Sequence, residues 1–279
     1  MNGNRARRAR LRDDVLARAR DQVLLMGILN VTPDSFSDGG QFLNPRAAMA
    51  QVEALDADGA DIIDVGGEST RPGAAEVSAG EEIERVLSVI PGLCASSSRI
   101  VSIDTYKAAV ALAAAEAGAV IINDVWGMTR DTSMAQVVAE TESAVVVTYN
   151  RGNIQPDINI ADDMRDFFAN AFAMAAAAGI PREHVILDPG VGFGKTWQQN
   201  FDVLARLDVL MDFGAPVLVG VSRKSFIGRL LDREVQDRLI GTLAAGLASV
   251  QRGATILRVH DVREHADALK MLKAIDEAG

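Results

Sequence analysis

The stretch RIVSIDTYKAAVALAAAEAGAVIINDV, residues 99–125, contains one complete unit of the pattern that decides the fold. It begins with a β-branched run that ends at Asp104, continues through an alanine-rich segment that ends at Gly118, and closes with a second β-branched run. The apolar residues of both runs are nearly continuous, which is typical of parallel strands buried on both faces. A glycine directly before the second run indicates a helix end and a short loop. The stretch therefore predicts a strand, a helix and a second, parallel strand.

The same unit recurs along the chain, and no linker rich in Pro, Gly and Ser divides it. The apolar runs are LLMGILNV from Leu24, DIIDVGG from Asp61, RIVSIDT from Arg99, AVIINDV from Ala119, AVVVTYN from Ala144, HVILDPG from His184, PVLVGVS from Pro216 and ATILRVH from Ala254. Eight β/α units in roughly 250 residues predict a single α/β domain, a (β/α)₈ TIM barrel. A doubly wound open sheet is the alternative, but it requires a glycine-rich phosphate turn after its first strand, and the segment from Asn30 is not one.

Composition places the chain among globular proteins with a sizeable core. It has 279 residues, of which 48% are hydrophobic and 24% charged, and its formal net charge is −10. This composition excludes disorder for most of the chain. The single cysteine, Cys94, cannot form an internal disulfide, so we expect a cytoplasmic location. No apolar run approaches the roughly 18 residues that span a bilayer, so we expect no membrane association.

The first 22 residues form a basic segment ahead of the first predicted strand. Residues 1–20 contain seven arginines and two aspartates, whereas the remainder of the chain is acidic. The arginines leave no obvious apolar stripe, so we expect a solvated helical extension whose deletion leaves the barrel folded. The acidic body would repel a phosphate backbone, and no nucleic-acid partner is expected. We therefore divide the chain into a basic extension, residues 1–22, and a barrel domain, residues 23–279.

Polar residues stand at the ends of all eight predicted strands. The carboxyl ends of the strands carry the active site in (β/α)₈ barrels. A buried carboxylate costs on the order of several kcal/mol unless it is paired, so a lone aspartate there could be structural, but eight polar ends indicate a functional site. The residues at these ends are, in chain order, Asn30, Asp64, Asp104, Asn123 with Asp124, Tyr149 with Asn150, Asp188, Ser222 to Ser225, and Arg258 with His260.

These side chains fall into two groups by chemistry. Asp104, Asn123 and Asp188 offer acceptors and amide groups that suit the edge of a heterocycle rich in N–H donors. The second group offers donors for an anion and consists of Arg71, Lys224, Arg258 and His260. The pattern predicts a pocket that holds a planar nitrogen ring on one side and an anionic group on the other.

The segment GVGFGK, residues 190–195, has the glycine content of a phosphate-binding loop. It lacks the four-residue spacing and the Lys-Ser/Thr ending of a P-loop. We therefore exclude an ATPase. The sequence also contains no Ser-His-Asp or Cys-His arrangement typical of nucleophilic catalysis.

Seven motifs taken together resemble the dihydropteroate synthase family. They are MGILNVTPDSFSDGG, IIDVGGESTRPGA, VSIDT, IINDV, LDPGVGFGKT, VGVSRKSFIG and RVHDV, and they run in the family's order from Met26 to Val262. The resemblance implies a homodimeric (β/α)₈ barrel, a transferase of folate biosynthesis that sulfonamides inhibit. It also implies Mg²⁺ as cofactor and two small-molecule substrates, 4-aminobenzoate and 7,8-dihydropterin-6-ylmethyl diphosphate.

The resemblance implies a role for each residue that matches a motif. Asn30 would lie with Mg²⁺ and the diphosphate. The pterin would be held by Asp104, Asn123, Asp188 and Lys224, with Asp64 in the same network. Thr70 and Arg71 would meet the diphosphate and aminobenzoate side, and the aminobenzoate would be bordered by Pro72, Phe193 and Ser225. Arg258 and His260 would bind the diphosphate. The residues expected to act in catalysis, by electrostatic stabilisation, are Asp104, Lys224, Arg258 and His260.

The chain departs from the family pattern after the fifth predicted strand, where Thr148-Tyr149 replaces the usual Met-His. This change affects the contacts under the pterin. Two alternatives stay open: a methyltransferase of the methyltetrahydrofolate type, which would not need the SRKS and RVH segments to grip diphosphate, and a noncatalytic pterin-binding paralogue. Retention of the residues for both pterin and diphosphate argues against the paralogue.

Overall fold

Eight parallel strands form a barrel in the computed structural model, which describes residues 2–32, 45–69, 76–96 and 100–278. The strand order is β6-β5-β4-β3-β2-β1-β8-β7, and a bridge between Leu187 and Val217 joins β6 to β7. The predicted (β/α)₈ barrel is confirmed, with a strand in each of the eight apolar runs. The strands are β1 (Leu24–Asn30), β2 (Ile62–Gly66), β3 (Ile100–Asp104), β4 (Ile121–Asp124), β5 (Ala144–Thr148), β6 (Val185–Asp188), β7 (Leu218–Val219) and β8 (Ile256–Val259).

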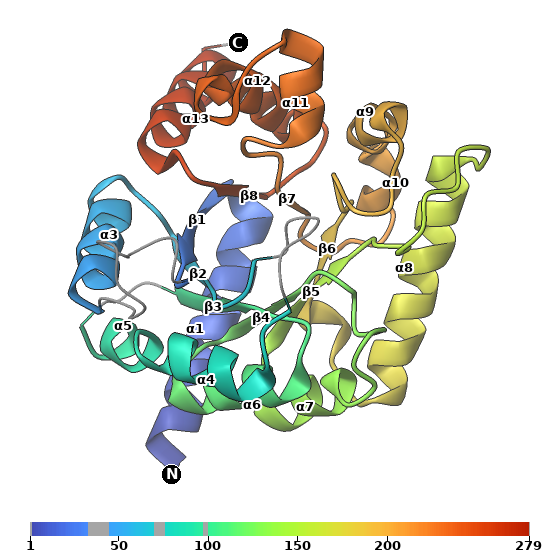
Figure 1. Cartoon of the computed structure of the whole chain (residues 1–279). Coiled ribbons are helices and arrows are strands. Elements are labelled where there is room, and N and C mark those ends of the chain that lie inside the picture. Colours follow the sequence, from blue (N-terminus) through green and yellow to red (C-terminus); the bar gives the residue numbers. More distant parts are fainter. Residues whose placement is uncertain (1, 33–44, 70–75, 97–99, 279) are drawn as a thin grey trace.

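Helices cover the outside of the barrel (Figure 1). Local signals set their ends: Thr196 and Gln199 form a capping box at the start of α9, and Gly118 ends α6 with a φ of 125° that favours glycine. None of the helices within the described ranges is long and apolar enough to cross a membrane. The helices are α3 (Pro45–Ala57), α4 (Ala79–Leu87), α5 (Ile90–Ser96), α6 (Ala108–Ala117), α7 (Met134–Thr141), α8 (Ile160–Ala177), η1 (Arg182–His184), α9 (Trp197–Ala205), α10 (Asp208–Met211), α11 (Ser225–Leu231), η2 (Val235–Asp237), α12 (Leu239–Val250) and α13 (Val262–Asp276).

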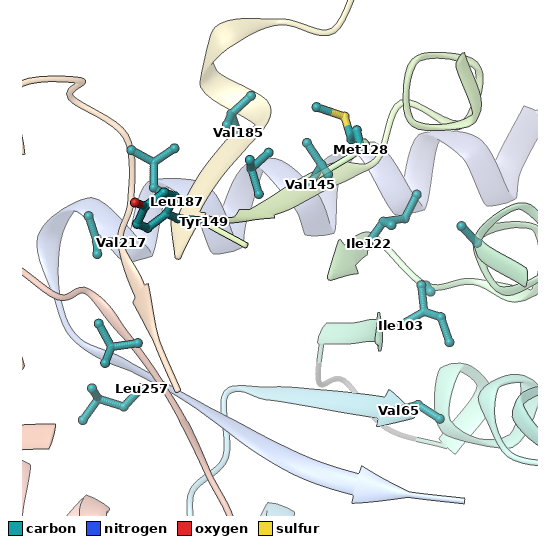
Figure 2. Packing of buried hydrophobic residues seen from close by; sticks show 14 of the residues in the cluster. Val65, Ile103, Ile122, Met128, Val145, Tyr149, Val185, Leu187, Val217 and Leu257 are labelled. Atoms are coloured by element: carbon teal, nitrogen blue, oxygen red, sulfur yellow. The ribbon is translucent and has the colours of Figure 1, made fainter. Parts of the chain in front are cut away.

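Alternate residues of each strand point into the barrel, because successive side chains of a strand lie on opposite faces. The outward set, which includes Val65, Ile103, Ile122 and Leu257, packs in the cluster shown in Figure 2. The inward set forms a separate apolar cluster toward the amino ends of the strands and includes Leu24, Met26, Ile62, Ile100, Ile121, Val146, Ile186, Leu218 and Ile256. On β2, β4, β6 and β8, the next inward-facing residue after the apolar one is polar. These residues are Asp64, Asn123, Asp188 and Arg258. The alternation therefore places these polar side chains directly above an apolar floor.

The basic N-terminal segment closes the amino end of the barrel as a helix, α1 (Asn2–Asp21). Its residues Val15, Leu16 and Ala19 are buried and belong to the inward apolar cluster. The expected solvated extension is therefore wrong. Three apolar residues at helical spacing are enough to plug the barrel, and the surrounding arginines conceal this stripe in the sequence.

Two arginines of α1 are buried and bind groups at the amino end of the barrel. Arg8 donates from Nε to the carbonyl oxygen of Ala119 at 2.9 Å and from a terminal nitrogen to Oγ of Ser143 at 2.8 Å. Arg12 donates to the carbonyl oxygen of Glu142 at 2.6 Å. These arginines satisfy buried acceptors that would otherwise lose their hydrogen bonds to water. The division of the chain at residue 22 remains a prediction.

We expect Leu16→Ala to lower the melting temperature by about 4–20 °C. Removing a buried leucine side chain costs about 2–5 kcal/mol, and each kcal/mol is worth about 2–4 °C in a protein of this size. Differential scanning calorimetry measures the change, with Arg10→Ala, an exposed position of the same helix, as the control. A melting temperature equal to that of the control would contradict a plugging role for α1.

Candidate active site at the carboxyl end of the barrel

A buried charge cluster occupies the carboxyl end of the barrel. Arg258 on β8 donates from Nε to Oδ2 of Asp64 and from a terminal nitrogen to Oδ2 of Asp104, both at 2.6 Å. The amide of Asn123 on β4 donates to the same Asp64 oxygen at 3.1 Å. Because buried carboxylates are tolerated only when they are paired, these bonds explain how four polar residues from four strands can share one interior. The structure thus brings together four of the predicted site residues.

Several buried oxygen atoms in this part of the barrel have no hydrogen-bond partner among the described residues. They include Oδ1 of Asp64, Oγ of Ser102, Oδ1 of Asp104 and Oγ1 of Thr148. Burial raises the pKa of Asp104 to about 7, although Arg258 opposes the shift. A buried acceptor without a partner costs roughly 1–3 kcal/mol, so native proteins retain few of them. These oxygens suit a ligand that supplies N–H donors when it enters.

A second part of the site lies between β6 and the start of α11. Oδ1 of Asp188 accepts a hydrogen bond from the main-chain N–H of Gly190 at 2.7 Å. The ammonium of Lys224 donates to the carbonyl oxygen of Val191 and lies 4.8 Å from the ring centroid of Phe193. Burial lowers the pKa of Lys224 to about 8 and raises that of Asp188, while the attraction between the two opposite charges works against both shifts. Asp188, Phe193 and Lys224 therefore form one group.

Asn30 lies at the end of β1 beside Gly66 at the end of β2. A Cβ atom on Gly66 would stand 3.5 Å from Oδ1 of Asn30 and 3.7 Å from Cβ of Asp104, so both side chains lie next to this position. The described residues contain no group of three His, Cys, Asp or Glu side chains placed to hold a metal ion. Mg²⁺ often takes only one or two protein ligands and completes its shell with water and phosphates. The amide oxygen of Asn30 therefore fits Mg²⁺ as a single protein ligand beside a bound phosphate.

His260 follows β8, and Ser225 follows β7. Nδ1 of His260 is hydrogen-bonded to Oγ of Ser222 at 2.9 Å, and its main-chain N–H donates to the same oxygen at 3.2 Å. Ser225 is exposed at the first position of α11. Ser222, a strand-end residue to which the sequence analysis gave no role of its own, orients the imidazole through this hydrogen bond. The predicted residues Thr70, Arg71 and Pro72 lie outside the described residues.

A buried ion network beside the site was also missed from the sequence. Lys107, at the start of α6, donates to Oε2 of Glu68 at 2.5 Å, to Oε2 of Glu82 at 2.6 Å and to the carbonyl oxygen of Val77 at 2.7 Å. It ties Glu68, which follows β2, to α4. The partners lie 25–39 positions away in the chain, so no local sequence pattern predicts these bonds.

The site can be compared with known proteins. A family profile described as "Pterin binding enzyme" matches residues 26–260. A dihydropteroate synthase of Bacillus subtilis (strain 168) is 44% identical over 263 residues, which cover 93% of this chain and 91% of the relative.

Two solved structures agree with this chain along most of its length. A dihydropteroate synthase from Clostridium difficile, solved in the presence of pteroic acid, has a TM-score of 0.88 and 46% identity, covering 91% of this chain and 97% of the other. The Xanthomonas albilineans dihydropteroate synthase with 4-aminobenzoic acid has a TM-score of 0.88 and 43% identity, covering 92% and 94%. With the family profile spanning most of its length and relatives above 40% identity, the chain belongs to the pterin-binding enzyme family.

Proposed function

We propose that the chain is a dihydropteroate synthase, which joins 4-aminobenzoate to 7,8-dihydropterin-6-ylmethyl diphosphate and releases 7,8-dihydropteroate and diphosphate. The observation that carries the proposal is the buried cluster of Asp64, Asp104, Asn123 and Arg258, with two carboxylate oxygens that have no partner among the described residues. A pterin ring supplies the N–H donors that these oxygens lack. The cations Lys224 and Arg258 beside the ring site favour a substrate with an anionic leaving group over a methyl donor.

The pterin binds with its N–H edge toward the carboxylates. Asp104 and Asp188 accept hydrogen bonds from the ring, Asn123 bonds through its amide, and Lys224 donates to the ring acceptors from the opposite side. Asp64 holds Asn123 and Arg258 in place through its bonded oxygen, and its second oxygen is a further acceptor for the ring. Phe193 supplies an apolar wall for 4-aminobenzoate, and Ser225 borders the same substrate.

Catalysis is electrostatic. The bond between the pterin methylene carbon and the diphosphate oxygen breaks first, and diphosphate leaves with the electron pair. Arg258 and His260 hold the departing anion, and a guanidinium has enough N–H donors to bind the carboxylates and an anion together. The carboxylates of Asp104 and Asp188 stabilise the cation left on the pterin.

The amine nitrogen of 4-aminobenzoate then forms the new bond to the methylene carbon and loses a proton. When Mg²⁺ is bound, with Asn30 as its protein ligand, it neutralises charge that develops on the diphosphate.

The proposed setting is the cytoplasm, with small molecules as substrates and no nucleic-acid partner. The single cysteine, Cys94, is free and forms no disulfide with the rest of the chain.

We expect Asp104→Asn and Lys224→Ala each to reduce kcat/KM by more than about tenfold, because each removes a charge that acts on the reacting atoms. Diphosphate release from purified protein with both substrates and Mg²⁺ tests the function itself as well as the variants. The matched controls are Asp267→Asn and Lys270→Ala, two exposed positions of α13 that should leave the rate unchanged. Absence of diphosphate release by the unmodified chain would refute the proposed function, and near-normal rates in both site variants would refute the assigned site.

We expect pterin affinity to rise with pH through about pH 7. The pKa of Asp104 is raised to about 7, and its carboxyl group loses an acceptor when it is protonated below that value. Isothermal calorimetry with 6-hydroxymethylpterin between about pH 6 and pH 8 measures the effect. In Asp104→Asn this dependence should disappear, and a pH dependence that persists in the variant would assign the titration to another group.

We propose that the protein forms a homodimer through one face of the barrel. Helices α11, α12 and α13 lie together at one side of the barrel (Figure 1). The large apolar side chains exposed on α11, η2, α12 and α13 are Leu230, Leu231, Val235, Ile240, Met271 and Ile275. Exposed apolar side chains that gather on a surface mark an interaction site, and the resemblance to a homodimeric family indicates a second copy of the chain as the partner.

We expect Ile240→Asp to convert the dimer into monomers, because Ile240, at the start of α12, is 74% exposed and a charge there would be buried in the dimer. Sedimentation velocity measures the mass. Ile154→Asp is the control, since Ile154 is 58% exposed on the loop after β5 and belongs to none of these helices. A monomeric unmodified protein would refute the dimer, and a dimeric Ile240→Asp variant would refute this face.

A further inference from the structure

Lys195, the lysine of the GVGFGK segment, is buried in the loop between β6 and α9 and is 7% exposed. Its ammonium donates to the carbonyl oxygens of Tyr149 at 2.7 Å, Gly190 at 2.8 Å and Phe193 at 3.0 Å. An ammonium has three N–H donors, so the three carbonyls account for all of them. The lysine therefore binds the main chain, and no N–H donor is left for a phosphate.

The ring of Tyr149 forms one wall of the ammonium site. The ammonium of Lys195 lies 4.2 Å from its ring centroid, a distance at which a cation is attracted to the face of an aromatic ring. Tyr149 is fully buried beside Leu187, as Figure 2 shows, and its hydroxyl donates to Asp163 on α8. The tyrosine that departs from the family pattern therefore contacts Lys195 with both its ring and its carbonyl oxygen.

One glycine connects this lysine to the site. The carbonyl oxygen of Gly190 accepts from Lys195, and its N–H donates to Oδ1 of Asp188 at 2.7 Å. Gly190 has a φ of 66°, and a Cβ atom there would stand 2.1 Å from the carbonyl oxygen of Tyr149, so no side chain fits. Lys195 and Asp188 thus bond to the two peptide groups that flank the α-carbon of Gly190, Asp188 to the preceding one and Lys195 to the following one.

The same loop carries Phe193. Its carbonyl oxygen accepts a hydrogen bond from Lys195, and its ring centroid lies 4.8 Å from the ammonium of Lys224. Lys224 also holds the carbonyl oxygen of Val191. The loop is thus folded around two ammonium groups, of which only Lys224 belongs to the site described above.

We propose that Lys195 is a positioning residue for the reaction: without touching either substrate, it sets the Asp188 carboxylate through Gly190 and the aromatic wall at Phe193. This inference rests on the proposed function. Displacing a binding group by about 1 Å can cost on the order of a hundredfold in rate, so a lysine behind the site can control both substrates.

The test is Lys195→Met, which keeps the length of the side chain and removes its charge and donors. We expect at least about a fivefold increase in KM for 4-aminobenzoate and at least about a fivefold loss of affinity for 6-hydroxymethylpterin, measured well below the melting temperature. Lys195→Gln, which retains two N–H donors, should give intermediate values and also serves if the methionine variant does not fold.

Thr196→Ala is the matched control. It removes the capping bond of α9 at the neighbouring residue, which costs about 1 kcal/mol of stability, and should leave KM and pterin affinity within about twofold. A lowered melting temperature with unchanged KM and affinity in both Lys195 variants would overturn the proposal and leave the lysine a purely stabilising role. The pterin titration needs no turnover, so it tests the positioning role even if diphosphate release fails and the proposed function with it.

Discussion

The ion pairs of Arg258 with Asp64 and Asp104 are the interaction on which the site depends. Two carboxylates inside a barrel would repel each other and lose their hydration, and one guanidinium between them offsets both costs. Their second oxygens stay without partners among the described residues, which is a cost in stability that ligand binding can remove. The ion pairs therefore allow the charged residues to be buried, and the unpartnered carboxylate oxygens remain as acceptors for a ligand.

The apolar half of the barrel makes this arrangement possible. The inward side chains near the amino ends of the strands exclude water, and α1 closes that end with Val15, Leu16 and Ala19. A floor without water keeps the electrostatic interactions above it strong, because the effective dielectric constant is low. The basic helix thus contributes to the site indirectly, by sealing the opposite end of the same interior.

Several basic side chains donate hydrogen bonds to main-chain carbonyl oxygens, at both ends of the barrel. Arg8 and Arg12 bind carbonyls at the amino end of the barrel, and Lys195 binds three carbonyls next to the site. In each case a long cationic side chain donates to carbonyl oxygens of residues that lie outside the strands, in the connecting segments. At the amino end this contributes stability, and at the carboxyl end the same chemistry orients Asp188 and Phe193 for the proposed reaction.

The sequence alone determined the barrel and most of the strand-end residues. Apolar runs such as residues 100–103 and 121–122, with glycines such as Gly118 between them, are local signals, and the convergence of parallel strand ends brings Asp64, Asp104, Asn123 and Arg258 together without further information. The role of α1 and that of Lys195 were decided by tertiary structure. Their acceptors are carbonyl oxygens, which every residue carries, so no pattern of side chains encodes them. For Arg8 and Arg12 these acceptors lie 111 and 130 positions away, and only the closed barrel brings them within reach.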